Sequence, residues 1–166
     1  MNRAPAFALR PFLIEDTPLL AEIFRASVEE LTEDDYTPPQ QEAWAAAADD
    51  LEEFAARLAK HLTLIATMEG SPVGFISLDG PGAIGLFYVH PAAAGQGAGR
   101  MLCDAVEKLS AARGVAQLSV DASDNAREFF ERRGFTPEQR NSVSAGNEWL
   151  SNTTMKKKLA ANEGTS

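Results

Sequence analysis

The segment from Leu86 to Leu102, LFYVHPAAAGQGAGRML, most constrains what this chain can fold into. A nearly continuous apolar run over 84–90 predicts a central buried strand, which a proline closes. Glycines at 95, 97 and 99 follow, and apolar residues at helical spacing then predict a helix over 100–113. Glycines let several backbone N–H groups converge, and a helix N-terminus adds unpaired donors and a partial positive charge. The segment therefore predicts a cradle for a pyrophosphate group.

Two familiar nucleotide-binding loops do not fit this segment. A P-loop requires Gly-Lys-Ser/Thr, and no lysine follows these glycines. A dinucleotide fingerprint requires a third glycine three residues after the second, where this chain has Arg100 or Leu102. The structural alternative is a turn that only joins strand to helix. Three glycines exceed what one such turn needs, so we favour the cradle.

The rest of the chain predicts a mixed sheet with helices on its faces. Thr17 followed by Pro18 predicts the start of one helix, and the Ala- and Glu-rich stretch 40–61 predicts a second. Ser123 or Asp124 is expected to cap a short helix that ends at Gly134. Further strands are expected at 7–10, 62–68, 73–78 and 117–121, with two weaker strands within 136–159.

The strand–proline–glycine–helix segment resembles motif A of the GNAT superfamily of N-acetyltransferases. That motif reads Q/R-x-x-G-x-G/A and holds the pyrophosphate of coenzyme A. Gly97 and Gly99 match its two glycines, whereas Ala94 stands where the family has Gln or Arg.

A second stretch supports the resemblance. Residues 122–135, ASDNAREFFERRGF, are similar to the family pattern N-x-x-A-x-x-Y-x-x-x-G-F. Ala126 and the Gly134–Phe135 pair match, whereas Ser123 replaces the Asn that contacts the cofactor. The family's Tyr, often the general acid for the leaving thiolate, is best represented by Phe130. The helix at 40–61 and the segment GFISLDG loosely resemble a bacterial subgroup, the YafP-like group.

The resemblance implies an α/β (α+β) fold, with a mixed, mostly antiparallel sheet of six to seven strands and about four helices. It implies direct transfer of acetyl from acetyl-CoA to a primary amine, which we expect to belong to a small molecule, and no metal. A backbone N–H near Phe87 or Tyr88 is expected to face the oxyanion. The residues expected to bind the cofactor are Phe87, Tyr88, Val89, Ala94, Gly95, Gln96, Gly97, Ala98, Gly99, Arg100, Ser123, Ala126 and Phe130.

The general base stays open among four residues near strand ends. A lysine-type amine has a pKa near 10.4 and arrives charged, so a carboxylate or a relayed water must accept its proton. Asp79, Tyr88, His90 and Asp121 are the candidates. Three of the four also have a structural interpretation: a turn residue for Asp79, a strand-end partner for His90 and a local cap for Asp121.

The general acid and the acceptor pocket depend on aromatic residues. Phe130 cannot donate a proton, so we expect slower turnover or protonation of the thiolate by solvent, with Tyr36 and Tyr88 as candidate replacements. Tyr36 and Trp44 are also the residues expected to line the acceptor pocket, near the acidic segment 33–35. The structural alternative, core aromatics beside a solvated turn, is slightly favoured.

The charge and the cysteine content of the chain limit the classes of binding partner and compartment that we expect. A formal net charge of -9 disfavours nucleic acid and membrane surfaces. The one cysteine, Cys103, is expected in the core, and with no signal segment the chain is expected in the cytoplasm. We expect one domain over 1–166, with a disordered tail at 160–166, as a monomer or homodimer. The departures at Ala94, Ser123 and Phe130 leave open a catalytically silent coenzyme A-binding module, and a nucleotide-binding oxidoreductase fragment is a third hypothesis.

Overall fold

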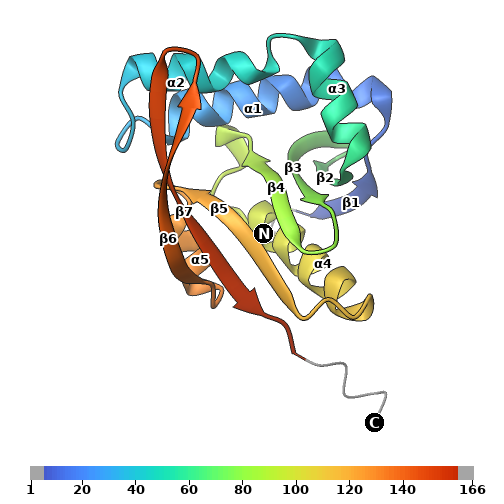
Figure 1. The fold of residues 1–166 in the computed structure, drawn as a ribbon. Coiled ribbons are helices and arrows are strands. Elements are labelled where there is room, and N and C mark those ends of the chain that lie inside the picture. Colours follow the sequence, from blue (N-terminus) through green and yellow to red (C-terminus); the bar gives the residue numbers. More distant parts are fainter. Residues whose placement is uncertain (1–5, 161–166) are drawn as a thin grey trace, which may run out of the picture.

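The computed structural model describes residues 6–160, which form one seven-stranded sheet with helices on both faces (Figure 1). The strands are β1 (Phe7–Pro11), β2 (Leu62–Met68), β3 (Ser71–Asp79), β4 (Ala83–Val89), β5 (Gln117–Ser123), β6 (Thr136–Ala145) and β7 (Glu148–Lys158). The α-helices are α1 (Thr17–Leu31), α2 (Pro38–Ala45), α3 (Leu51–Lys60), α4 (Ala98–Ala112) and α5 (Arg127–Arg132). The tail expected at 160–166 lies outside the described residues except for Ala160.

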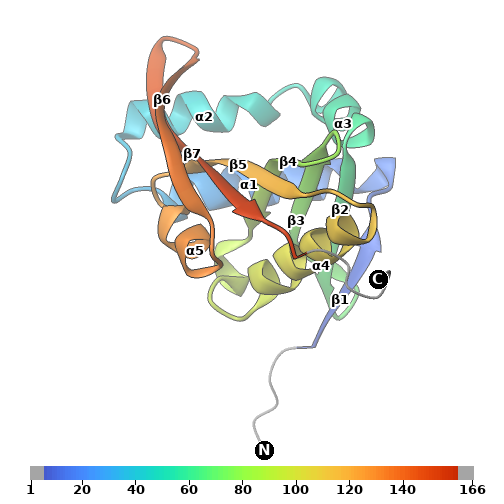
Figure 2. The ribbon, with the colours of Figure 1, turned by 60° about the horizontal axis from the view of Figure 1, so that its bottom comes forward.

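The strand order in the sheet is β1-β2-β3-β4-β5-β7-β6, and every neighbouring pair except β4–β5 is antiparallel. The prediction of a mixed, mostly antiparallel sheet of six to seven strands is therefore confirmed. Two apolar cores cover the two faces, one under α1 and α3 and the other under α4. Figure 2 shows how these helices are arranged around the sheet. Strand β4 serves both cores, because its side chains alternate: Leu86 and Tyr88 pack toward α1, and Phe87 and Val89 pack toward α4.

Strand β4 leaves its parallel neighbour after two residue pairs. Ala83 pairs with Ser119 and Ile84 with Val120, and no later residue of β4 pairs with β5. Figure 1 shows the two strands diverging from that point in the middle of the sheet. The antiparallel pairing of β4 with β3 continues to Val89, so β4 keeps one paired edge and opens the other.

The prediction of one continuous helix over 40–61 is wrong. Helix α2 ends at Ala45, a 3-10 turn covers Ala46–Ala48, and α3 begins only after Asp50. The extended backbone of Asp50 breaks the helix, and its carboxylate accepts a hydrogen bond from the amide of Glu53 (3.1 Å). The cap at Asp50 was not predicted because the alanine-rich sequence around it favours a continuous helix. The break raises the number of α-helices from the predicted four to five.

Candidate active site

The loop between β4 and α4 is built around two glycines in left-handed backbone conformations. Gly95 has φ 77° and Gly97 has φ 103°, a region that side chains with a Cβ rarely adopt. A 3-10 turn at Pro91–Ala93 precedes them, and His90 Nδ1 steadies it by accepting a hydrogen bond from the amide of Ala92 (3.0 Å). Open space surrounds the position that a Cβ would take at either glycine. The loop is thus open to solvent at its glycines.

Several backbone amides of the loop and of the first turn of α4 have no hydrogen-bond acceptor within residues 6–160. Gly97 is the N-cap residue of α4 and has no side chain to cap it, and the first bond of the helix is Met101 N to Gly97 O (3.0 Å). Within residues 6–160, no acceptor binds the N–H groups of Gly95, Gly97, Ala98, Gly99 and Arg100. Gly99 also allows close packing, because a Cβ there would lie 3.1 Å from Cζ of Phe87. Several unpaired donors at a helix N-terminus make an anion-binding concavity.

The open edge of β4 carries the same kind of unpaired group. The amide of His90 donates to Val73 O on β3 (2.8 Å), and hydrogen-bonded pairs alternate along an antiparallel ladder. The backbone N–H and C=O of Tyr88 therefore point toward β3, as those of His90 do. The backbone groups of Phe87 and Val89 point the other way, to the side from which β5 has departed. Of the two residues expected to offer an oxyanion donor, the register favours Phe87.

Two cavities meet at this opening. A cavity of about 530 Å³ runs along the glycine loop and the end of β4, and we call it the cofactor cavity. A cavity of about 370 Å³ lies between β4, β5, α3 and the β6–β7 hairpin, and we call it the acceptor cavity. Their walls share Trp44, Phe87, Tyr88, Ser123 and Ala126. A molecule in one cavity can therefore reach a molecule in the other beside Tyr88.

Comparisons with known proteins agree with this geometry. An acetyltransferase (GNAT) domain model matches residues 32–159. The uncharacterized N-acetyltransferase YafP of Escherichia coli is 31% identical over 150 residues, which make up 90% of this chain and 95% of YafP. The chain belongs to the GNAT family of acetyltransferases.

Solved structures place this acetyltransferase within the same fold. A crystal structure of a GCN5-related N-acetyltransferase from Rhodopseudomonas palustris has a TM-score of 0.91 and 58% identity, and the match covers 95% of this chain and 97% of that chain. The PaiA N-acetyltransferase of Thermoplasma acidophilum, solved with coenzyme A, has a TM-score of 0.77 at 20% identity, over 93% of this chain and 99% of that one. The chain is thus an acetyl-CoA-dependent acyltransferase, and the hypothesis of an oxidoreductase fragment is set aside.

The structure brings together most of the residues expected to bind the cofactor. Those that line the cofactor cavity are Phe87, Tyr88, Val89, Ala94, Gly95, Gly97, Gly99, Arg100, Ser123 and Ala126. Phe130 lines the acceptor cavity instead. Gln96 and Ala98 line neither: Gln96 Nε2 donates to Ala92 O (3.2 Å), and Ala98 is buried.

Sequence reasoning missed several residues of the cofactor cavity. Asn125, Phe129 and Arg132 line it as well. Asn125 carries a signal that was available, because it is an amide two residues after Ser123, which replaces the family's Asn. Phe129 lies beside the predicted Phe130 on α5, and the helix turns it toward the cavity while Phe130 enters the core. Nothing in the sequence marked Arg132.

Tyr88 occupies the junction of the two cavities. Its hydroxyl accepts a hydrogen bond from Trp44 Nε1 (3.2 Å), and within residues 6–160 no acceptor takes its proton. Burial raises the pKa of Tyr88 to about 12, with the Trp44 hydrogen bond and the charge of Arg57 acting in the opposite direction. Tyr88 is therefore protonated at neutral pH, with a proton available for donation.

The other base candidates lie in different surroundings. Asp121 lines the acceptor cavity, and its Oδ1 accepts a hydrogen bond from Thr154 Oγ1 (2.6 Å). Asp79 lines neither cavity, and its Oδ1 lies 3.6 Å from Nε2 of His61. His90 lines neither cavity and holds the 3-10 turn. Asp121 is thus the carboxylate candidate within reach of an acceptor.

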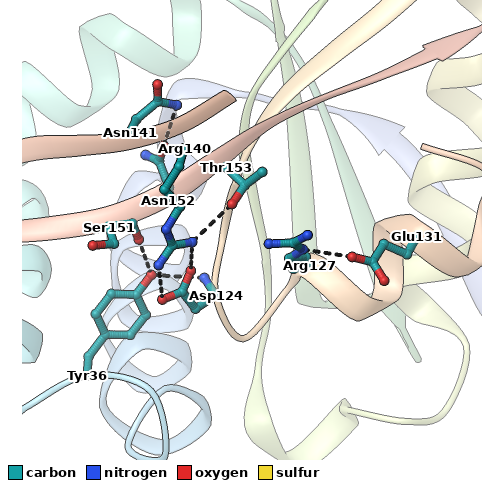
Figure 3. Close-up of polar contacts among 9 residues, drawn as sticks. All are labelled: Tyr36, Asp124, Arg127, Glu131, Arg140, Asn141, Ser151, Asn152 and Thr153. Carbon is teal, nitrogen blue, oxygen red and sulfur yellow. Dashed lines mark hydrogen bonds and ion pairs between the residues drawn. The ribbon is translucent and has the colours of Figure 1, made fainter. Parts of the chain in front are cut away.

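Tyr36 and Trp44 form one wall of the acceptor cavity, with their rings edge to face at 5.2 Å. Figure 3 shows that the Tyr36 hydroxyl joins distant segments: it donates to Ser151 O (2.6 Å) and accepts from the amide of Asp124 (2.9 Å). Burial raises the pKa of Tyr36 above its usual value. Because its proton is held by Ser151 O, Tyr36 is a less available acid than Tyr88.

Phe130 lies in the apolar core. It is 1% exposed and packs against Phe87 and Phe135, with ring centroids 5.7 and 5.1 Å away. The position that best represents the family's tyrosine therefore supports the wall of the acceptor cavity by packing and offers no proton.

Proposed function

We propose that this acetyltransferase transfers the acetyl group of acetyl-CoA directly to a primary amine of a small molecule. The divergence of β4 from β5 beside a loop of unpartnered amides carries the proposal. Acetyl-CoA fits the residues present, because the pyrophosphate needs several donors at one point and the loop supplies them without a side-chain cation. The pantetheine amides need a strand edge, and Phe87 and Val89 present one.

Cations extend this groove beyond the loop. A further hollow of about 590 Å³ adjoins the cofactor cavity through Arg100, Asn125, Phe129 and Arg132, and Arg133 and Lys157 also line it. Glu128 also lines this hollow, and its cations other than Arg100 form ion pairs with carboxylates. Arg100 is therefore the cation there that can bind the remaining phosphate of coenzyme A without first losing an ion pair within residues 6–160. The proposal therefore assigns the glycine loop to the pyrophosphate and this hollow to the nucleotide end.

The reaction centre follows from the shared wall of the two cavities. The N–H of Phe87 faces the opening and stabilises the developing oxyanion, a contribution of about 3 kcal/mol for a well-placed donor. Asp121, directly or through water, receives the proton of the arriving ammonium. Tyr88 returns a proton to the leaving thiolate.

A catalytically silent coenzyme A-binding module is the second candidate. The observation that favours it is the buried phenylalanine at the position of the family's acid, together with Ala94 and Ser123 in the cofactor-binding motifs. The free hydroxyl proton of Tyr88 argues against it.

The free Cys103, buried in the α4 core, fits a reducing compartment such as the cytoplasm, which we include in the proposal.

Calorimetry and thiol release together test the proposal. We expect purified protein to bind acetyl-CoA by calorimetry and to release thiol when a panel of small primary amines is added. Mass spectrometry is expected to find the acetyl group on the amine. Binding without thiol release on any amine supports the silent module, and absence of binding refutes both candidates.

A further inference from the structure

We propose that the acceptor is an amine that carries a carboxylate, as a free amino acid does, and that Arg57 binds this carboxylate. The inference rests on the proposed function and names its substrate class. Arg57 lies on α3 and lines the acceptor cavity, but it does not line the cofactor cavity. The phosphates of coenzyme A are assigned to the opposite end of the groove, so they do not account for it.

Arg57 has no partner in a chain rich in acids. Among the arginines of residues 6–160, six form an ion pair with a carboxylate, namely Arg10, Arg25, Arg127, Arg132, Arg133 and Arg140. Arg57, Arg100 and Arg113 have no such partner within that part of the chain. Two of these three line the cavities, Arg100 at the cofactor end and Arg57 at the acceptor end. Arg57 and Arg100 are exposed and unpaired within the described residues, so each guanidinium group is available to an anion at its end of the groove.

The charge of Arg57 acts close to the reaction centre. It lowers the pKa of Tyr88 against the larger, raising effect of burial, and it also adds to the lowering of the pKa of His61. Tyr88 is the residue that both cavities share. Arg57 and Tyr88 also line the same cavity, so one small molecule can place a carboxylate on Arg57 and an amine beside Tyr88.

The second charge on the wall of the acceptor cavity matches the other end of such a molecule. Asp121 and Arg57 are the ionisable groups of opposite sign there, and Ser144, Ser151 and Asn152 add polar contacts. An anion and a cation facing one cavity suit a zwitterion, with its ammonium toward Asp121 and its carboxylate on Arg57. The volume of about 370 Å³ is at the lower end of the range for small-ligand sites.

This arrangement separates free amino acids from the other amine classes. A peptide N-terminus, a lysine side chain within a protein and a simple amine all lack a carboxylate close to the reacting nitrogen. Each leaves the guanidinium of Arg57 without a counter-charge. We therefore expect these acceptors to be poorer by at least about 10-fold in kcat/KM, the factor for one charge-assisted contact.

Matched acceptors test the assignment in the wild-type protein. Thiol release from acetyl-CoA is measured with leucine, leucinamide and isoamylamine, with phenylalanine, phenylalaninamide and phenethylamine, and with β-alanine. We expect the acids to exceed their amides and decarboxylated amines in kcat/KM. If the neutral amines react as well as the acids, the carboxylate assignment is overturned while the transferase proposal stands. If acetyl-CoA binds and no amine reacts, both fail.

A second test uses variants of Arg57. Arg57→Gln is expected to lower kcat/KM at least about 10-fold more for the acids than for the neutral amines, because any effect of the lost charge on Tyr88 is common to both. Arg57→Lys is expected to restore part of the loss, and Arg113→Gln, which changes an unpaired arginine outside both cavities, is the control. Calorimetry of leucine binding to the protein with coenzyme A gives a readout without turnover. Equal losses for acids and neutral amines in Arg57→Gln contradict carboxylate binding.

Discussion

Replacing Gly97 by aspartate tests the pyrophosphate cradle most directly. Gly97 has φ 103° and no atom within 4 Å of the position that a Cβ would take, so the new side chain meets no steric obstacle. It places a carboxylate among the free amides at the start of α4. The matched control is Gly97→Asn, which has the same shape and backbone strain without the charge, and asparagine tolerates this region best among residues with a Cβ.

The expected effect follows from two terms. A residue with a Cβ at this φ costs about 1–2 kcal/mol of stability in either variant. The charge acts only in Gly97→Asp: at a separation of about 6 Å and an effective dielectric constant of about 40, each phosphate charge costs about 1.4 kcal/mol. Two such charges give about 2.8 kcal/mol. We therefore expect acetyl-CoA to bind Gly97→Asp about 100-fold more weakly than Gly97→Asn at low salt.

Calorimetry over a range of salt concentrations measures this difference. The ratio of the two dissociation constants is expected to shrink as salt screens the charges. S-acetylpantetheine, which lacks the pyrophosphate, is expected to bind both variants alike. Gly70→Asp, at a left-handed glycine in the β2–β3 turn, reports the stability cost alone. Equal affinities of Gly97→Asp and Gly97→Asn for acetyl-CoA at low salt would refute the cradle.

Three further predictions concern single side chains. Tyr88→Phe is expected to lower kcat about 100-fold, the low end for general acids because a thiolate is a tolerable leaving group, and to leave acetyl-CoA affinity unchanged. Since burial raises the pKa of Tyr88 to about 12, the pH–rate profile of the wild type is expected to show no falling limb below pH 10; a limb there contradicts the role. Burial likewise raises the pKa of Cys103 to about 12, so iodoacetamide at pH 8 is expected to label the unfolded chain and spare the native one, as mass spectrometry reports. Asp16→Asn is expected to lower the free energy of unfolding by about 1–3 kcal/mol in urea titrations, because its carboxylate accepts two hydrogen bonds from Arg10 (2.7 Å each) and one from the amide of Leu13 (2.9 Å). These bonds hold the pKa of Asp16 below its usual value, so the difference between variant and wild type is expected in full above pH 3.8 and is lost progressively as the pH falls through the lower pKa of the folded state.

The cofactor loop could be predicted from the sequence because its signals are local. Glycines at 95, 97 and 99 between a buried strand and a helix leave few backbone conformations, and two of the three have positive φ. The strand at 84–90 was predicted within one residue of β4, because a continuous apolar run requires burial on both faces. The break at Asp50 was missed, since one capping carboxylate among alanines is a weak signal beside the surrounding helix propensity.

The acceptor side depended on contacts that no local pattern contains. The Tyr36 hydroxyl meets Ser151, 115 residues away, and Arg57 enters a cavity whose other walls come from β4, β5 and the β6–β7 hairpin. Asp79 and Asp121 look alike at strand ends, yet only Asp121 lines a cavity.

The sequence by itself determined most of the elements, their order and the left-handed turns of the glycine loop, because dihedral restrictions and hydrophobic periodicity act over a few residues. The tertiary structure decided which edge of β4 is open, which tyrosine keeps a free proton and which arginine lines the acceptor cavity. Those outcomes depend on how β4 and β5 diverge and on which side chains the sheet brings together. Such long-range packing follows from the free energy of the whole chain, and no short stretch of sequence encodes it.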